Sequence, residues 1–264
     1  MGTDRWAYRS RLRAIDPLAK LWLTLGALIV CLGCGSAGVG LATLALLSAY
    51  SVVLGGQPVK TVVKCLLIPL AFLLAGSVTL VLRPLGEGAA LWAVSLPVLG
   101  RWGVSVESLA LAGTVLCRAM GAASCLFFLA LNTPVCDLTA ALGRLHAPAL
   151  LVELMELIYR FLFVLSGEAG RIHTAQAARL GYGTWRRSIT SLGELLSVLF
   201  VRALRRGERV YAALESRGYT GSLVTVTGQY EKGTWLYGLL LGTAVVQIFI
   251  WTLERGGLSW MLWR

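Results

Sequence analysis

Long apolar runs alternate with short polar segments along this chain, and the runs have the length that crosses a lipid bilayer. Residues 18–54 are apolar apart from Lys20 and a cluster of glycines. A single helix of that length would measure roughly 55 Å, against a hydrocarbon core of about 30 Å. We therefore expect two membrane helices with a tight turn near Gly35-Ser36. Three further spans are predicted at residues 61–82, 108–131 and 235–253.

The polar segments around the spans carry their own signals. Asp16 and Pro17 form a typical helix start, with Asp16 as the N-cap. Pro69 predicts a kink in the third span. Residues 83–107 form the longest predicted outer loop, with balanced charge and several glycines and prolines. Within this loop, Leu91–Leu99 is apolar but too short to cross, and we interpret it as a re-entrant or interfacial piece.

Two long helical patterns between the fourth and fifth spans are amphipathic. The first begins at Pro148 and continues for about 30 residues at the spacing of a helix. Charged residues interrupt it, so that no uncharged stretch reaches the roughly 18 residues of a span. The second is predicted from Ser188 to Arg217, with leucines on one side and arginines mainly on the other. A shorter amphipathic helix over residues 137–148 precedes both. We expect these helices to pack on others at a membrane surface.

Composition fixes the class. The chain has 264 residues, of which 57% are hydrophobic and only 14% are charged, whereas soluble domains have roughly 25% charged residues. The runs are continuous rather than alternating, which argues against a β-barrel. The predicted fold is an all-α polytopic membrane protein. It has about five transmembrane helices and a cytoplasmic unit of long amphipathic helices between spans four and five.

The net charge of +11 follows largely from inner loops, which collect lysine and arginine. Four arginines precede the first span and place the N-terminus in the cytoplasm. Between Arg171 and Gly218, the sequence has nine arginines and only three glutamates. An anionic partner surface accounts for this excess, and no nucleic acid is expected. We divide the chain into an N-terminal cytoplasmic segment, four spans, a cytoplasmic helical region, and a fifth span with a tail, at residues 1–17, 18–131, 132–228 and 229–264.

Few residues suggest chemistry. Arg118 lies near the middle of the fourth span, so it must face protein or water: either it is a structural arginine bonded to helix ends or carbonyls, or it contacts a partner membrane protein. Cys31 and Cys34 form a Cys-x-x-Cys pair in an apolar run. We interpret them as small buried residues of a membrane helix rather than as ligands of a zinc site. His146 and His173 are far apart in sequence.

The sequence lacks the recurring catalytic motifs. It has no Gly-x-x-x-x-Gly-Lys-Ser/Thr loop and no His-Glu-x-x-His. The predicted spans contain no acidic residue that would suggest a proton- or sodium-coupled carrier. A membrane protein without an energy source of its own, but with a large basic helical unit, is expected to use a soluble partner. We therefore expect no enzymatic activity from this chain.

Several motifs resemble one family. The most specific run from Asn132-Thr133-Pro134 through Arg160-Phe161 to Tyr219, and the opening Asp4-Arg5-Trp6 with Asp16-Pro17 is similar too. Together they resemble the transmembrane T component of energy-coupling factor (ECF) ABC transporters, in its cobalt branch (CbiQ/EcfT type). The resemblance implies a bacterial inner-membrane subunit for cobalt uptake, linked to cobalamin biosynthesis, with nickel or a vitamin as alternative cargo.

In that family, two Ala-Arg-Gly motifs end cytoplasmic coupling helices and dock on ATPases. By position, Arg179 and Arg217 match the motif arginines, and their neighbours Ala178, Gly181, Ser216 and Gly218 complete the two sites. The sequence departs from the motifs, because Leu180 stands at the first glycine and Ser216 at the second alanine.

The resemblance also implies the partners. These are two ABC ATPases (CbiO type), a substrate-binding membrane subunit (CbiM type), a small CbiN-type subunit and membrane lipid. This chain would bind no cofactor, because ATP and magnesium belong to the ATPases and the transported metal to the partner membrane subunit. Without the resemblance, the two arginines could be ordinary residues facing a helix dipole. A stand-alone carrier and a membrane enzyme are the competing functions.

Overall fold

The structure is a computed structural model, and it describes residues 2–81, 83–84, 92–96, 100–219 and 230–261. Almost all of them are helical. The chain divides into two compact units, which are considered one at a time. The first unit comprises residues 1–134 and 229–264, and the second comprises residues 135–228.

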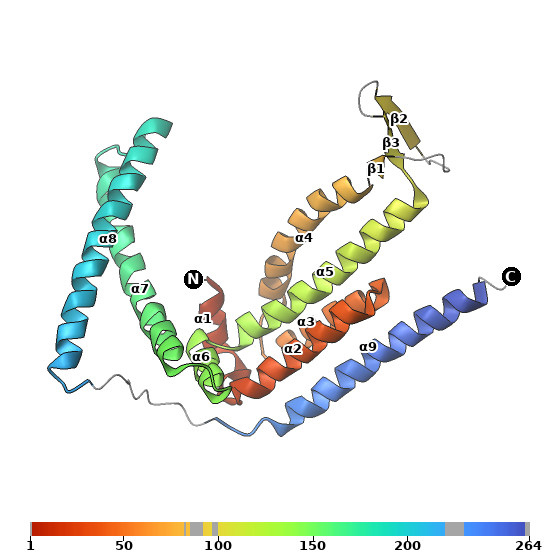
Figure 1. The fold of residues 1–264 in the computed structure, drawn as a ribbon, viewed down its shortest axis with the longest axis horizontal. Coiled ribbons are helices and arrows are strands. Elements are labelled where there is room, and N and C mark those ends of the chain that lie inside the picture. The colour runs from red at the N-terminus through yellow and green to blue at the C-terminus, as the bar shows by residue number, and fades with distance from the viewer. Residues whose placement is uncertain (1, 82, 85–91, 97–99, 220–229, 262–264) are drawn as a thin grey trace. The chain divides into compact units, whose positions relative to one another are not determined.

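The membrane helices of the first unit confirm the all-α polytopic architecture (Figure 1). After a short α1 and a 3-10 turn η1, five long apolar helices follow. Four of them are long and apolar enough to cross a membrane, and α3 is a shorter apolar helix of 17 residues. The elements are α1 (Gly2–Arg9), η1 (Arg11–Ala14), α2 (Pro17–Cys34), α3 (Ala37–Val53), α4 (Val59–Val81), α5 (Val106–Asn132) and α9 (Thr234–Met261).

The turn between α2 and α3 lies where the glycine cluster predicted it. Gly35 ends α2 with φ of +63°, a conformation that glycine adopts without steric cost. Ser36 then caps α3 by accepting a hydrogen bond from the backbone nitrogen of Val39 at 3.4 Å. Because the turn is so short, residues 17–53 fold as two neighbouring helices, as the length argument required.

The carboxylate of Glu254 also holds this turn. It accepts hydrogen bonds from the Ser36 hydroxyl and, at 3.0 Å, from the backbone nitrogen of Gly38. The sequence pattern ended the fifth span at residue 253, but α9 continues to Met261 and carries Glu254 within it. An acid at the N-terminus of α3 is favoured by the helix dipole, and this explains a charged residue at the end of an apolar helix.

Small residues let α3 and α5 approach closely. A Cβ added to Gly40 would lie 2.5 Å from the carbonyl oxygen of Cys117, and one added to Gly121 would lie 2.7 Å from the carbonyl oxygen of Gly40. Such contacts between backbones are a common way of packing membrane helices. The first unit also has a buried apolar cluster, drawn from the N-terminal segment, α2, α3, α5 and α9: Leu12, Ile15, Ala19, Leu23, Ala27, Leu47, Cys125, Phe128 and Leu236.

A small antiparallel sheet connects α4 and α5 (Figure 1). Its order is β1-β3-β2, formed by Arg83–Pro84, Gly100–Val104 and Trp92–Leu96. A re-entrant or interfacial helix over residues 91–99 is therefore wrong for residues 92–96, which form a strand paired with β3, whereas an interfacial position of this segment stays a prediction; residues 91 and 97–99 lie outside the described residues. Large and small residues alternate in Trp-Ala-Val-Ser-Leu, a period of two that favours a strand.

A buried polar cluster joins the N-terminal segment to the ends of the membrane helices. Lys20 is fully buried, and its amino group donates to the carbonyl oxygens of Leu12 at 3.0 Å and Asn132 at 3.4 Å. The Ser10 hydroxyl donates to the Asn132 side chain at 2.8 Å. Apart from the polar residue types, no sequence pattern indicates this cluster, because several of its partners are backbone groups brought together by folding.

The same N-terminal segment also pairs with the chain that enters α9. The backbone nitrogen of Asp16 donates to the carbonyl oxygen of Glu231 at 3.1 Å, and Glu231 donates to Ala14 at 2.8 Å. Residues 10–20 thus hold both the chain that leaves α5 at Asn132 and the chain that enters α9.

The second unit consists of three helices, α6 (Val135–Arg144), α7 (Ala149–Ala178) and α8 (Trp185–Glu215). Residue 148 precedes α7, as predicted. However, α8 begins three residues earlier than the predicted Ser188, because the Thr184 hydroxyl caps it by accepting from the backbone nitrogen of Arg187 at 3.4 Å.

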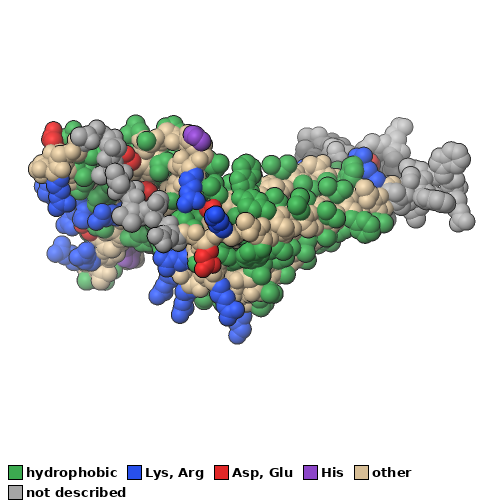
Figure 2. Space-filling view, turned by 90° about the horizontal axis from the view of Figure 1, so that it is seen from below, with side chains coloured by type: hydrophobic (Ala, Val, Ile, Leu, Met, Phe, Trp, Pro, Cys, Tyr) green, Lys and Arg blue, Asp and Glu red, His purple; other side chains and the backbone are tan. Residues whose placement is uncertain are grey.

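Exposed apolar side chains are abundant, as a membrane protein requires. On α4, Ile68 is 71% and Phe72 is 79% exposed. Hydrophobic side chains cover much of the surface in Figure 2. The apolar surface is therefore available to lipid or to partner membrane helices.

Candidate functional site: two arginine-bearing helix ends

Helices α7 and α8 form one antiparallel hairpin. Contacts at three positions along the helices establish this. Near the turn, Gln176 Nε2 donates to Ser191 O at 2.9 Å, and in the middle Glu168 forms an ion pair with Arg202. At the far end, the Tyr219 hydroxyl donates to Glu153 at 3.2 Å. Residue numbers fall along α7 as they rise along α8. The first arginine of the site therefore lies at the hairpin turn, and the second lies near the start of α7.

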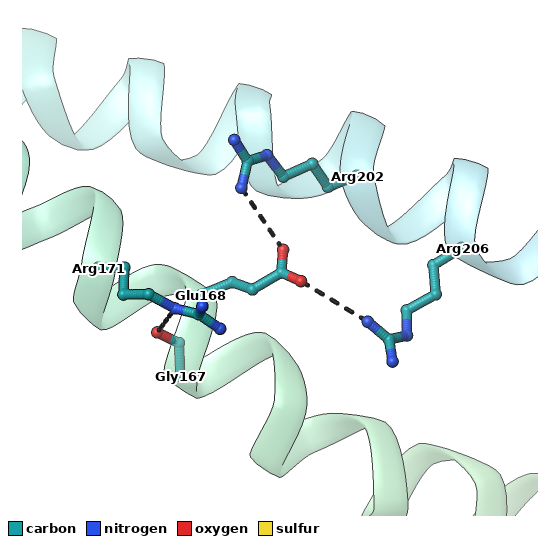
Figure 3. Close-up of polar contacts among 5 residues, drawn as sticks. All are labelled: Gly167, Glu168, Arg171, Arg202 and Arg206. Carbon is teal, nitrogen blue, oxygen red and sulfur yellow. Dashed lines mark hydrogen bonds and ion pairs between the residues drawn. The ribbon is translucent and has the colours of Figure 1, made fainter.

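Charge stabilises the middle of the hairpin. Figure 3 shows the Glu168 carboxylate of α7 between two guanidinium groups of α8. The distances are 3.8 Å to Arg202 and 3.6 Å to Arg206. Arg206 also lies over the ring of Phe161, 5.4 Å from its centre. Two guanidinium groups that share one carboxylate fix the register of the two helices more firmly than one exposed ion pair would.

The first arginine end, residues 176–181, closes α7 with a Schellman cap. The Gly181 nitrogen donates to Gln176 O at 2.9 Å, and the Leu180 nitrogen donates to Ala177 O at 3.0 Å. Arg179 is the C-cap and is exposed, and Ala178 is the last helical residue. Leu180 takes the left-handed conformation that such a cap requires, with φ of +58°.

The second arginine end, residues 214–219, closes with the same pair of bonds. The Tyr219 nitrogen donates to Leu214 O at 3.1 Å, and the Gly218 nitrogen donates to Glu215 O at 3.0 Å. Gly218 has φ of +74°. Arg217 is exposed and directly precedes it, as Arg179 precedes Leu180.

The caps align the two ends residue by residue. Leu180 is the counterpart of Gly218, and Gly181 is the counterpart of Tyr219. Leucine thus takes the conformation of the motif's glycine at the first end, which removes the irregularity that the sequence suggested. At the second end, Ser216 replaces alanine without consequence, because its hydroxyl donates within its own helix to Ala213 O at 3.0 Å.

Gly181 is required for a different reason. A Cβ at this position would lie 2.7 Å from the Ser191 hydroxyl and 2.9 Å from Gln176 O. Ser191 in turn donates to Gly181 O at 3.0 Å, and the Tyr182 hydroxyl donates to the Gln176 side chain at 2.9 Å. This network joins the end of α7 to the first turns of α8, so Arg179 is carried on a rigid turn.

Tyr219 fixes the second end to the start of α7. Its partner Glu153 is only 8% exposed. Partial burial, together with the hydrogen bond and negative charge of Glu153, raises the pKa of Tyr219. A phenol is protonated at neutral pH even at its ordinary pKa, so Tyr219 is a donor there. Arg217 is therefore held by its helix and also by a side-chain contact next to it.

The two arginines are separated by the length of α8. This helix has 31 residues, which corresponds to roughly 46 Å. An arginine at each end of a rod of that length can bind two anionic sites far apart on a partner, or one site on each of two partners. A guanidinium group binds a carboxylate in a bidentate, directional way.

A hollow beside the first end adds two more arginines. Its volume is about 530 Å³, and Arg179 lines it together with Arg186 and Arg187 at the start of α8. The hollow is also lined by Leu180, Gly181, Thr184, Thr190 and Ser191. Sequence analysis included Arg186 and Arg187 only in the count of basic residues, whereas the structure places both beside Arg179 at one hollow.

Arg118 does not belong to this site. In the first unit, its guanidinium donates to the carbonyl oxygen of Leu32, in the last turn of α2. A cation there is favoured by the helix dipole. Arg118 therefore ties α5 to the end of α2.

The residues considered for metal chemistry lie apart or act structurally. Cys31 is buried beside α5 in the first unit, where its thiol lies 3.9 Å from Arg118 O, and both Cys31 and Cys34 are free thiols. His173 stacks on Tyr182 with 4.5 Å between ring centres. In the described part of the chain, no three His, Cys, Asp or Glu side chains gather as a metal site.

The fold and the two arginine ends define a class: a multi-pass membrane protein with a basic helical hairpin. Residues 9–227 match the family described as cobalt transport protein, CbiQ. The chain belongs to this family, which confirms the resemblance drawn from its motifs. It is a transport component of the CbiQ/EcfT type.

Individual relatives agree. The chain is 32% identical to the cobalt transport protein CbiQ of Salmonella typhimurium, over 83% of this chain and 97% of that protein. It is 41% identical to a fused cobalt transport protein CbiMQ of Methanocorpusculum labreanum, over 46% of this chain and 20% of that protein. It is 31% identical to the energy-coupling factor transporter transmembrane protein EcfT of Listeria innocua, over 47% of this chain and 51% of that protein.

Proposed function

We propose that this chain is the non-catalytic coupling and scaffold subunit of an ECF-type importer, and that it serves cobalt(II) uptake. One observation carries the proposal: two exposed arginines, Arg179 and Arg217, follow the ends of two long helices, in identical caps, at opposite ends of one hairpin. Two equivalent contacts suit two like ATPase subunits, each offering a carboxylate.

The mechanism follows from the rigidity of the hairpin. When two ATPases bound at the two ends close on ATP, they change the distance or angle between their docking sites. A hairpin held by Glu168, by the Gln176–Ser191 contact and by Tyr219 moves as one body instead of bending. Its motion then passes to the membrane helices and to a substrate-binding membrane subunit.

The other partners are part of this proposal. The ATPases are of CbiO type and hold ATP and magnesium, and a CbiM-type subunit with a CbiN-type subunit holds the metal. The exposed apolar helices, including α4, lie against lipid or that subunit. The N-terminus is on the cytoplasmic side of a bacterial inner membrane, because four arginines lie just before α2.

Charge reversal tests the proposal. Arg179→Glu with Arg217→Glu should abolish co-purification of the ATPases and ATP-dependent cobalt uptake, because like charges then face each other. The matched control is Arg205→Glu with Arg209→Glu, which changes the charge equally at exposed positions of α8. Size-exclusion chromatography shows whether each variant folds.

The proposal fails if the reversed variant still binds ATPases and drives uptake. Uptake by the chain alone in liposomes would instead favour a stand-alone carrier. The cargo is tested separately, by competition among cobalt, nickel and vitamins for uptake through the assembled transporter.

A further inference from the structure

The two arginine ends share a cap, but they differ in charge. Lining the hollow at the first end are Arg179, Arg186 and Arg187, and the sequence has no acidic residue from position 179 until Glu194. At the second end, Glu215 lies two residues before Arg217. The first end thus carries three uncompensated positive charges, whereas the second end, residues 214–219, is neutral as a whole.

The first end is held by several contacts. Thr184 fixes the first turn of α8, and Gly181 leaves no space between this turn and the end of α7. Holding three guanidinium groups around one hollow costs repulsion in the free protein. A bound anion with several oxygens relieves this repulsion and accepts from donors that are already in position. Binding therefore loses little conformational entropy of the side chains.

We infer that the hollow formed by Arg179, Arg186 and Arg187 binds a cluster of carboxylates on one ATPase, and that it is the tighter and more salt-dependent of the two docking contacts. This inference rests on the proposed function. The occupant is a side-chain cluster of two or more Asp or Glu residues, because three bidentate donors exceed what one carboxylate can accept. The second end binds a single carboxylate through Arg217.

The test compares two pairs of neutralised arginines. Arg186→Gln with Arg187→Gln should weaken binding of the purified ATPases to the membrane subunit in nanodiscs by about tenfold at low salt. It should also flatten the dependence of affinity on salt. The control, Arg205→Gln with Arg209→Gln, removes the same charge from α8 and should change affinity by less than about twofold.

The single changes order the two ends. Arg179→Gln should weaken ATPase binding more than Arg217→Gln does, because it removes one of the three arginines that bind the carboxylate cluster. If the double variant does not reach the membrane, Arg187→Gln alone should give about a threefold loss with the same change in salt dependence.

Two results would overturn the inference: an affinity and salt dependence like those of the unmodified protein, or an equal loss in the control pair. Failure of the proposed function is distinguishable from either of these. If the proposed function is wrong, the charge reversal of Arg179 and Arg217 leaves ATPase binding intact. If only the present inference is wrong, that reversal abolishes binding, but neutralising Arg186 and Arg187 has no effect on it.

Discussion

Replacing Leu180 by glycine should stabilise the end of α7, although the change removes an apolar side chain. Leu180 has φ of +58°, and its side chain is 71% exposed. A left-handed conformation costs a non-glycine residue roughly 1–2 kcal/mol. Since most of the side chain is already in water, its removal sacrifices little burial.

The net gain is smaller than the strain. Glycine has more conformational freedom in the unfolded chain than leucine, and this reduces the stabilisation by about 0.4–1 kcal/mol. We therefore expect Leu180→Gly to stabilise the cap by about 0.5–1 kcal/mol. The equivalent change at the second end has the opposite sign: Gly218→Ala places a Cβ where φ is +74°, although in the described part of the chain that Cβ would meet no atom within 4 Å.

Hydrogen exchange measures both changes at the amides that close the caps. A stabilisation of about 1 kcal/mol slows exchange about fivefold when the amide exchanges by local opening. The Gly181 amide, bonded to Gln176 O, should exchange more slowly in Leu180→Gly, and the Tyr219 amide, bonded to Leu214 O, should exchange faster in Gly218→Ala. Faster exchange at Gly181 in Leu180→Gly would refute the argument that the left-handed residue is strained.

Three further substitutions test close contacts, each read from thermal unfolding of the purified membrane protein. Gly181→Ala should loosen the hairpin turn by about 1–3 kcal/mol, because its Cβ would lie 2.9 Å from Gln176 O. Gly40→Ala should separate α3 from α5 at a similar cost, because its Cβ would lie 2.5 Å from Cys117 O. Lys20→Met should destabilise the first unit by about 1–3 kcal/mol, because buried carbonyl oxygens lose their donor.

Matched glycines serve as controls for the first two. In Gly183→Ala the new Cβ would be 3.5 Å from Leu180 O, an ordinary contact, and in Gly113→Ala it would meet no described atom within 4 Å. Equal losses in the control and test variants would contradict the packing argument. For Lys20→Met, an unchanged midpoint would mean that the carbonyl oxygens find other donors.

Much of the fold was predictable because it depends on local patterns. The spans follow from apolar length, the start of α2 from Asp16 and Pro17, and the turn before α3 from its glycines. The sheet was not predicted, because the apolar content of residues 91–99 was considered and the period of two in Trp92–Leu96, which favours a strand, was not. This strand pairs with β3, which follows it closely in the sequence. The assignment of docking to Arg179 and Arg217 stays a prediction.

The candidate site was also predictable only in part. The sequence identified the two arginines by their position at helix ends, but it made the first end look irregular. Only the hydrogen bonds show that Leu180 takes the glycine conformation and that Gly181 serves packing. Arg186 and Arg187 carried no signal of their own, since a charge count does not say which arginines face one hollow.

The sequence by itself determined that this protein lies in a membrane and carries a basic helical region, because apolar length and charge are sums over neighbouring residues. The tertiary structure decided that α7 and α8 form one hairpin with an arginine at each end. It also decided that Glu254 caps α3 and that Lys20 is buried. These features depend on groups far apart in the chain, and only folding brings them within bonding distance.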